Sequence, residues 1–212
     1  MKNSPAFFSP LQNYIDEIKQ SYDSISNERS NAIKDLATHI DHSIQSGGNV
    51  KLNFICTHNS RRSHLGQIWS ATAAAYHGIQ NILTYSGGTE TTAFNPRAVD
   101  AIKRAGFHIE NPGGNNPIYK VYMGQNIPPM ECFSKIYNDK FNPSKNFIAV
   151  MTCSDADKNC PIIPGAILRF PLRYKDPKEA DNTPMEQERY DERCRQIATE
   201  MFYLMSIIKN KK

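Results

Sequence analysis

Long hydrophobic runs are absent from this chain of 212 residues. No apolar stretch approaches the roughly 20 residues that a helix needs to cross a bilayer. The N-terminus also lacks the basic segment followed by an apolar one that marks a secretory signal. We therefore expect no membrane partner and place the protein in the cytoplasm.

The cysteines do not form an even set. The five cysteines are Cys56, Cys132, Cys153, Cys160 and Cys194. An odd set in a chain of this kind argues against a secreted disulfide framework and favours reduced, reactive thiols. Metal-ligand spacing is absent as well: His58, His64 and His77 show none with the cysteines, so we interpret them as surface or packing residues.

Charge of one sign is not concentrated in this sequence. The formal net charge is +4, and lysines and arginines are scattered except in the terminal residues 209–212. A nucleic-acid-binding domain carries a basic patch or stripe, so we expect no nucleic-acid partner. Internal repeats are absent too, and the length fits one domain with room for an extension. None of these properties sets the oligomeric state.

Residues 1–48 are predicted to form a helical extension ahead of a catalytic domain of residues 49–212. Apolar side chains recur at helical spacing over residues 11–22 and again over residues 32–44. The pair Gly47-Gly48 is typical of a helix end. We interpret the two stripes as a helical hairpin that covers the core; a partner-binding device is the alternative.

The rest of the chain alternates between strand and helix patterns. Strands are predicted at 51–55, 82–85, 146–152 and 166–170, and helices at 63–77, at 95–105 and from Thr183 toward Lys209. This order favours an α/β fold, with a four-stranded parallel sheet flanked by helices. Residues 107–145 are rich in proline, glycine and asparagine, so we expect loops there around one strand at 119–122 and a short helix at 133–137.

The loop of residues 56–63 joins the first of these strands to the helix that follows. Unpaired N–H groups and the helix dipole at such a junction both attract an anion. Cys56 takes the first position, and Arg62 can return its planar fork to the same anion. Active sites of parallel sheets lie at this edge, beyond the strand C-termini. We predict a nucleophile that faces a tetrahedral oxyanion. The residues predicted to bind the oxyanion are Thr57, His58, Asn59, Ser60, Arg61, Arg62 and Ser63.

Cys56 must be a thiolate to attack, and a free thiol titrates near about 8.5. The helix N-terminus, the loop amides and Arg62 all stabilise negative sulfur, so we expect substantial ionisation at neutral pH without a histidine base. Ser63 is placed to donate to the sulfur, and Asn59 to hold the loop. Asp176, fixed by the proline after it beyond a neighbouring strand, is the candidate acid for the leaving oxygen. The alternatives are a buried structural cysteine and an ordinary Asp-Pro turn.

Cys153 and Cys160 are separated by six residues and follow another central strand. They are therefore expected on the same rim of the sheet as Cys56, which permits a thiol relay. Cys153 can attack Cys56 once Cys56 is bonded to an oxidised centre, and Cys160 can then carry the disulfide to the surface. The polar residues 154–159 could loop out as the bond moves. Zinc binding and two inert cysteines are the alternatives, although the spacing is wider than in a usual zinc knuckle.

Several of these motifs together resemble the low-molecular-weight tyrosine phosphatase superfamily and, within it, the thioredoxin-coupled arsenate reductases. The resemblance runs from about residue 51 to the end of the last helix. It is carried by Phe54-Ile55-Cys56-Thr57 with Asn59-Ser60 and Arg62-Ser63, by Tyr85-Ser86-Gly87-Gly88 with Asn95-Pro96-Arg97-Ala98, and by Thr152-Cys153-Ser154-Asp155-Ala156-Asp157 with Asn159-Cys160-Pro161. The last stretch resembles a redox segment that tyrosine phosphatases of this fold lack. The resemblance implies Cys56 as nucleophile, Arg62 as oxyanion clamp, Asp176 as acid, and Cys153 and Cys160 as the relay.

The resemblance also implies how the site is supplied and supported. Reducing equivalents would come from thioredoxin, no cofactor would be tightly bound, and in some relatives a potassium ion supports the loop near Asn59 and Ser86. His58 stands where family loops usually carry glycine, so a positive backbone dihedral there would be strained. Arg61 stands where reductases of this type usually have another cysteine. Residues 107–145 are longer than the family pattern, and the helical extension has no counterpart.

These residues support three hypotheses of function. The first is reduction of arsenate to arsenite by a thiolate, with a cysteine relay recycled by thioredoxin. The alternative is a low-molecular-weight protein tyrosine phosphatase that hydrolyses phosphotyrosine or small phosphate monoesters through a phosphocysteine intermediate, because the same loop hydrolyses esters without further thiols. The third is a non-enzymatic anion-binding or scaffold module that uses the helical extension. The stretch from Cys153 to Cys160 favours the first.

Overall fold

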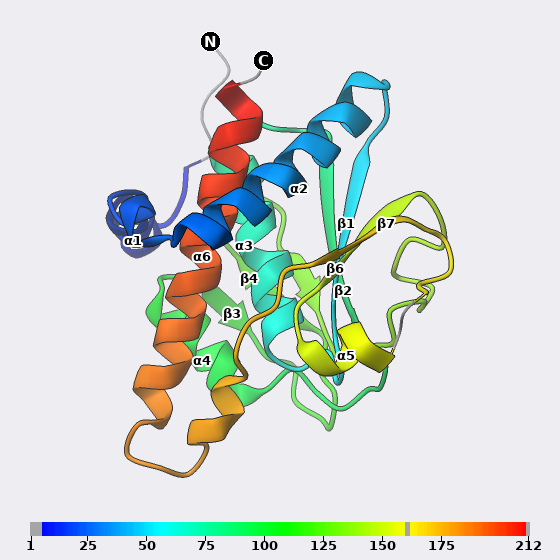
Figure 1. The fold of residues 1–212 in the computed structure, drawn as a ribbon. Coiled ribbons are helices and arrows are strands. Elements are labelled where there is room, and N and C mark those ends of the chain that lie inside the picture. Colours follow the sequence, from blue (N-terminus) through cyan, green and yellow to red (C-terminus); the bar gives the residue numbers. More distant parts are fainter. Residues whose placement is uncertain (1–5, 160–161, 211–212) are drawn as a thin grey trace.

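A parallel β-sheet of four strands forms the centre of the molecule (Figure 1). The computed structural model describes residues 6–159 and 162–210. The strands are β1 (Val50–Cys56), β2 (Ile82–Gly88), β6 (Phe147–Met151) and β7 (Ala166–Pro171). Their order is β2-β1-β6-β7, and every neighbouring pair is parallel. The predicted fold class, a four-stranded parallel sheet flanked by helices, is confirmed.

Apolar residues of β1 and β6 alternate between the two faces of this sheet. Leu52 and Val150 belong to the large core, whereas Ile55 and Met151 belong to a smaller cluster. All residues of β6 and all but one of β1 are buried, as central strands of a parallel sheet require. The sheet therefore buries apolar surface on both faces, and the smaller cluster contains Cys56.

Helices account for most of the remaining chain. They are α1 (Ser9–Lys19), α2 (Asn27–Gln45), α3 (Arg62–Tyr76), α4 (Pro96–Arg104), α5 (Ser154–Asn159) and α6 (Glu186–Asn210), with the short 3-10 helices η1 (Tyr22–Ser24) and η2 (Pro177–Ala180). The helices predicted on either side of the second strand are present. The last one begins at Glu186 rather than near Thr183, because Thr183 forms a turn in which its hydroxyl donates to Ala180 O at 2.8 Å. No helix among the described residues is long and apolar enough to span a membrane.

A small antiparallel sheet lies within residues 107–145. Its strands are β3 (His108–Glu110), β4 (Tyr119–Tyr122) and β5 (Met130–Cys132), in the order β3-β4-β5. The strand predicted at 119–122 is confirmed, and its two partners, each of three residues, were not predicted. The short helix predicted at 133–137 is wrong. That segment is not helical, because Gly88 binds it on both sides: Gly88 N donates to Lys135 O, and Tyr137 N donates to Gly88 O, both at 2.8 Å.

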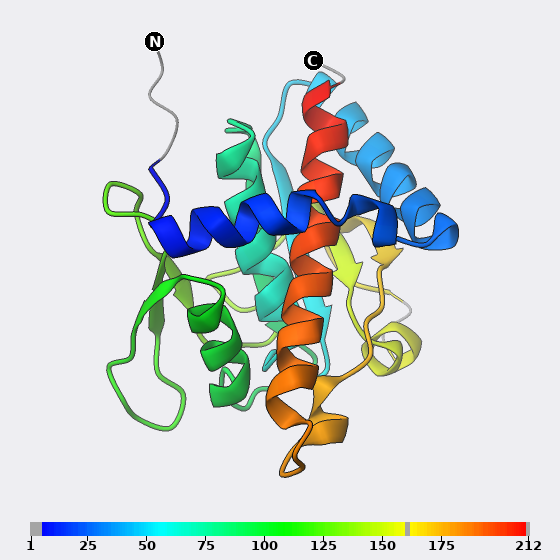
Figure 2. The same ribbon diagram turned by 90° about the vertical axis from the view of Figure 1, so that its left-hand side faces the viewer.

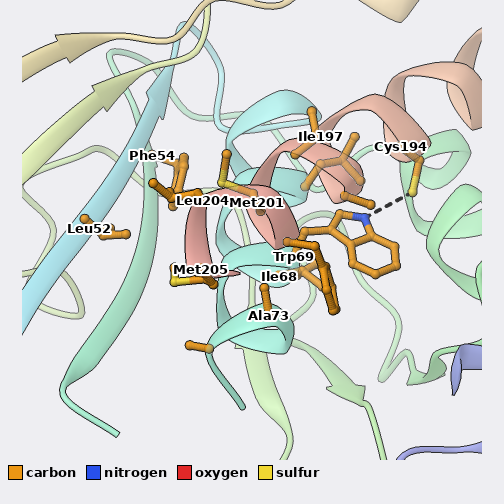
Figure 3. Close-up of a cluster of buried hydrophobic side chains, with 14 of the residues drawn as sticks. Leu52, Phe54, Ile68, Trp69, Ala73, Cys194, Ile197, Met201, Leu204 and Met205 are labelled. Atoms are coloured by element: carbon orange, nitrogen blue, oxygen red, sulfur yellow. Dashed lines mark hydrogen bonds between the residues drawn. The ribbon is translucent and has the colours of Figure 1, made fainter. Parts of the chain in front are cut away.

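The large core lies between the sheet, α3 and α6 (Figure 3). Trp69 is fully buried there, and its indole N–H donates to Cys194 Sγ at 3.3 Å. Burial raises the pKa of the Cys194 thiol to about 12. Cys194 is thus a protonated packing residue, as its position on the apolar stripe of the last helix indicates.

The extension helices pack onto this same core. Leu11, Ile15 and Ile18 of α1 and Ile33, Leu36, Ala37 and Ile40 of α2 are fully buried in it. The ring of Tyr14 stacks on Trp69 with 5.5 Å between centroids. Figure 2 shows α1 lying across α6. Both predicted stripes therefore cover apolar surface of the rest of the chain; the division into an extension of 1–48 and a catalytic domain of 49–212 stays a prediction.

Candidate active site

The nucleophile loop, residues 56–63, lies where the sequence places it. β1 ends at Cys56, which is in register with Gly88 of β2, and α3 begins at Arg62. Cys56 therefore stands at the C-terminal edge of the sheet and faces the first turn of a helix. The unpaired N–H groups of that turn and the positive end of the helix dipole stabilise negative charge at this position.

Four backbone carbonyl groups of this loop accept hydrogen bonds from residues outside the loop. The bonds are Thr89 N to Cys56 O (3.2 Å), Glu90 N to Thr57 O (2.8 Å), Ser134 Oγ to His58 O (2.8 Å) and Asn95 N to Ser60 O (2.9 Å). Because a peptide group is planar and trans, an outward carbonyl turns the N–H of the next residue inward. None of the N–H groups of residues 57–61 donates to another described residue. The loop is thus a cradle of free donors, which suits an oxyanion.

Ser63 and Asn59 hold the thiol group of the cradle. Asn59 Nδ2 donates to Ser63 Oγ at 2.9 Å, and Ser63 Oγ lies 3.0 Å from Cys56 Sγ. Since the serine oxygen already accepts a hydrogen bond from Asn59, its own hydroxyl proton is free to point at the sulfur. Asn59, with φ of +45°, is the loop residue in the left-handed region. The strain expected at His58 is therefore wrong in its position, and asparagine tolerates this conformation better than most residues.

Arg62 and Asp176, both predicted at the site, lie in contact with each other. Arg62 Nη2 lies 2.5 Å from Asp176 Oδ2, and Nη1 donates to the backbone carbonyl of Tyr174 at 3.0 Å. The third nitrogen, Nε, is buried without a hydrogen-bond partner among the described residues. The guanidinium therefore stands between the nucleophile loop and the acid loop, which we define as residues 172–181. A bound oxyanion can accept a hydrogen bond from Nε, which has no other acceptor among the described residues, and can compete with the Asp176 carboxylate for the bond from Nη2.

Arg61 faces the acid loop as well. Its Nε donates to Tyr190 Oη at 2.8 Å, and its Nη2 lies 3.6 Å from Asp181 Oδ2. Tyr190 in turn donates to Asp181 Oδ1 at 2.8 Å. Burial and this bond to Asp181 raise the pKa of Tyr190 to about 12. The Arg61 side chain thus ties the nucleophile loop to the acid loop. The backbone N–H of Arg61 remains available to bind an oxyanion.

Cys153 lies beside the nucleophile loop, on the same edge of the sheet as Cys56. It follows β6, is fully buried, and shares the smaller apolar cluster with Cys56. Its Sγ lies 3.5 Å from Thr57 Oγ1 and accepts from Ala156 N at 3.4 Å. This places the first relay cysteine next to the cradle. Cys160, the second, lies outside the described residues.

Residues 154–159, which the sequence suggests could loop out as a disulfide moves, form the helix α5. Asp157 in α5 is buried, and its carboxylate pairs with Arg169 of β7 and with Arg173, whose Nε lies 2.6 Å from Oδ2. A buried carboxylate needs such partners, because an unpaired buried charge is strongly destabilising. Two arginines therefore hold α5 against the edge of the sheet.

Residues that the sequence did not point to support the loop from the segment 133–137. Ser134 holds the His58 carbonyl, and Lys135 N donates to Asn59 Oδ1 at 3.0 Å. The Lys135 side chain is buried, and its Nζ donates to Phe133 O at 3.3 Å. Burial, with the nearby Lys135 charge, lowers the pKa of His64 well below its usual value. Nothing in the local sequence of this stretch indicates that these residues support the nucleophile loop.

The residues that the resemblance implies for potassium are only partly open. Ser86 Oγ is buried without a hydrogen-bond partner among the described residues, so its oxygen is free to face a cation. Asn59 donates to Ser63 and accepts from Lys135, which leaves one lone pair on Oδ1. Each residue thus keeps an oxygen lone pair that a cation could use. Within residues 6–159 and 162–210, no three His, Cys, Asp or Glu side chains gather as a metal site.

Comparison with known proteins identifies the family. No family model matches the chain. Arsenate reductase 2 of Staphylococcus epidermidis is 32% identical over 124 residues, which are 58% of this chain and 76% of the relative. Arsenate reductase 1 of Staphylococcus saprophyticus matches with the same identity and the same shares. The chain belongs to the arsenate reductase family.

Solved structures confirm the fold of this arsenate reductase family member. A low-molecular-weight phosphotyrosine phosphatase from Vibrio cholerae superposes with a TM-score of 0.53 and 14% identity, over 76% of this chain and 98% of that one. A low-molecular-weight protein tyrosine phosphatase from Bacillus subtilis gives 0.50 and 14%, over 76% and 98%. At such identities the likeness shows the fold alone.

Proposed function

We propose that this protein reduces arsenate to arsenite, with Cys56 as the nucleophile. The observation that carries the proposal is the position of Cys56 at the head of a loop whose inward N–H groups have no other acceptor among the described residues. A tetrahedral oxyanion can occupy that cradle with its central atom facing the sulfur. Curated relatives of this chain are arsenate reductases.

The first step forms a sulfur–arsenic bond. The Cys56 thiolate attacks arsenic, and a hydroxyl group of the protonated arsenate leaves as water after it receives one proton from Asp176. Arg62 Nε and the loop N–H groups hold the remaining oxygens as charge builds on them. The Ser63 hydroxyl, 3.0 Å from the sulfur, stabilises the thiolate before attack.

The second step moves electrons from sulfur to arsenic. The Cys153 thiolate attacks Cys56 Sγ, the electron pair of the sulfur–arsenic bond goes to arsenic, and arsenite leaves with arsenic reduced by two electrons. Cys160 then attacks Cys153 and releases Cys56 as thiolate. Two electrons from the thioredoxin dithiol reduce the resulting Cys153–Cys160 disulfide. The location of Cys153 beside Thr57 supports the first of these exchanges.

Steady-state arsenate reduction coupled to thioredoxin, thioredoxin reductase and NADPH tests the proposal in the full chain. Cys56→Ser and Cys153→Ser are each expected to lower turnover by more than about 100-fold, because each removes a sulfur that must form a bond. Cys132→Ser is the matched control, since Cys132 is also buried but belongs to the large core, whereas Cys56 and Cys153 belong to the smaller cluster. Undiminished turnover in Cys153→Ser contradicts the relay.

Hydrolysis of phosphate monoesters is the second candidate function. The same cradle, nucleophile and acid suffice for it, and the Vibrio cholerae phosphatase shares the fold. Fast hydrolysis of an aryl phosphate that survives Cys153→Ser and Cys160→Ser, without arsenate reduction, would establish this function instead. If Cys56→Ser leaves the biological activity intact, the chain is a non-enzymatic anion-binding module.

The proposed reaction cycle also needs a reductant, a reducing compartment and a rigid nucleophile loop. Thioredoxin would be the reductant, and the cytoplasm would be the compartment that keeps it reduced. Potassium would be held by Ser86 and Asn59 and would stiffen the nucleophile loop. Replacing potassium chloride with sodium chloride at equal ionic strength is then expected to raise the KM for arsenate.

A further inference from the structure

Arg29, in α2 of the extension, is bonded to residues far along the chain. Its Nε and Nη2 lie 2.9 and 2.8 Å from Glu200 Oε2 of α6. Its guanidinium carbon lies 4.4 Å from the centre of the Tyr174 ring, which is the geometry of a cation–π contact. Glu200 is only 2% exposed, so its carboxylate depends on this partner for compensation. The extension therefore supplies one charge of a buried ion pair.

Tyr174 carries this contact into the candidate active site. Its hydroxyl donates to Glu200 Oε2 at 2.7 Å, while its backbone carbonyl accepts from Arg62 Nη1 at 3.0 Å. Asp176, two residues on, pairs with the same Arg62 guanidinium. The ring of Tyr174 is therefore held between Arg29 and Glu200, and its backbone holds the oxyanion clamp.

The acid loop has a second anchor in its own backbone. Tyr174 N donates to Thr152 O at 3.0 Å, just past the end of β6. Leu172 N likewise donates to Met151 O at 2.9 Å, so two backbone bonds tie the start of the loop to the sheet edge. The Tyr174 side chain, held at both its face and its hydroxyl, adds a third tie. Loss of this side-chain tie would loosen the backbone that carries Asp176.

We propose that Arg29 is a positioning residue for the acid loop, and that it acts through Glu200 and Tyr174 on Arg62 and Asp176. The inference rests on the proposed function in so far as Asp176 and Arg62 act on the bound oxyanion. It gives the extension a part in catalysis, beyond covering the apolar core.

Three substitutions test this in the full chain. Arg29→Met keeps the length and packing of the side chain but removes the guanidinium, and Tyr174→Phe removes only the hydroxyl that reaches Glu200. Arg195→Met is the matched control. Arg195 also joins α6 to the extension, through Glu17 at 3.2 Å, but the two side chains are 43% and 63% exposed.

Two measurements are made below the melting temperature of each variant: amide hydrogen exchange of peptides that cover residues 172–181, and kcat and KM for arsenate as a function of pH. Arg29→Met and Tyr174→Phe are expected to speed exchange in the acid loop and to lower kcat by at least about tenfold, because a misplaced acid loses much of its effect. In the wild type, kcat should fall as the pH rises, because the acid must be protonated to donate. In these two variants that fall should be less steep. Arg195→Met should stay within twofold of the wild type in kcat.

Unchanged exchange of residues 172–181 in both variants overturns the proposal. So does faster exchange with wild-type kcat and pH profile, because the network would then be only structural. If Arg29→Met does not fold, Tyr174→Phe decides on the same measurements, since it leaves the Arg29–Glu200 pair in place. Failure of the proposed function looks different: the wild type then lacks arsenate reduction, while the exchange comparison still shows whether Arg29 holds the loop.

Discussion

Gly88 lies so close to the nucleophile loop that no side chain fits there. A Cβ atom at this position would lie 2.3 Å from Glu90 O, 2.6 Å from Thr57 O and 2.7 Å from Asn59 N. All three are backbone atoms, so a larger residue can be accommodated only if the cradle itself moves. Glycine is therefore required here, because any side chain would overlap with these backbone atoms.

Gly88→Ala is expected to lower the free energy of unfolding by about 3 kcal/mol, because overpacking forces backbone shifts. The same shift displaces the loop N–H groups, so phosphate, as an unreactive oxyanion, should bind at least about tenfold more weakly. Urea unfolding and calorimetric titration with phosphate measure the two effects. Gly48→Ala is the control, since nothing lies within 4 Å of a Cβ there. Wild-type phosphate affinity in Gly88→Ala would show that the loop is less rigid than its contacts indicate.

Among the elements, the segment 133–137 supports the nucleophile loop from outside the parallel sheet. Ser134 Oγ donates to His58 O at 2.8 Å and accepts from Thr92 N at 2.9 Å, so it joins two loops. The Asn116 side chain holds the backbone of Ser134 on both sides, at 2.8 and 3.0 Å. This extended segment thus fixes the peptide that turns the Asn59 N–H inward.

Ser134→Ala is expected to weaken phosphate binding by about five- to tenfold, since one hydrogen bond of about 1 kcal/mol that orients a donor peptide is lost. The melting temperature should fall by about 2–6 °C, because the bonds to His58 O and from Thr92 N are both lost. Ser206→Ala is the matched control: Ser206 Oγ donates to a backbone carbonyl in α6, away from the site. Equal phosphate affinity in the two variants, measured by calorimetry, would remove Ser134 from the list of loop supports.

At the scale of the whole molecule, two histidines of α3 and its C-cap link stability to pH. Burial, with the charges of Lys209 and Lys19, lowers the pKa of His77 to about 4, and burial, with the charge of Lys135, lowers the pKa of His64 well below its usual value. Both are neutral in the folded protein and take up a proton on unfolding below about pH 6.5. The free energy of unfolding therefore falls as pH decreases from about 6.5 toward 4.

His77→Gln is expected to make this fall less steep, by up to about 1 kcal/mol per pH unit between pH 6 and 4.5. Above pH 7.5 the variant and the wild type should show the same pH dependence, because His77 is then neutral in both the folded and the unfolded chain. Urea unfolding at a series of pH values measures the difference. Parallel curves for the two proteins over the whole range would mean that folding does not lower the pKa of His77.

The sequence by itself determined the elements that carry the nucleophile. The strand β1, the loop from Cys56 to Arg62 and the helix α3 follow from residues that are neighbours in the chain, because burial periodicity and helix starts are local properties. The alternation of strands and helices likewise determined a parallel sheet, and with it the edge on which Cys56 and Cys153 both lie. The roles given to these residues stay predictions until activity is measured.

Only the tertiary structure decided which groups hold the site. Ser134 reaches the His58 carbonyl from 76 residues away, Asp176 reaches Arg62 from 114, and Glu200 meets Arg29 across 171. Such contacts depend on the path of the whole chain, so no local pattern contains them. The same holds for β3 and β5, which are too short to show a strand pattern and gain their hydrogen bonds from β4. Packing of distant segments thus decided how rigidly the nucleophile loop is held. The local sequence had already determined the thiol, the N–H groups and the arginine that the loop presents to an oxyanion.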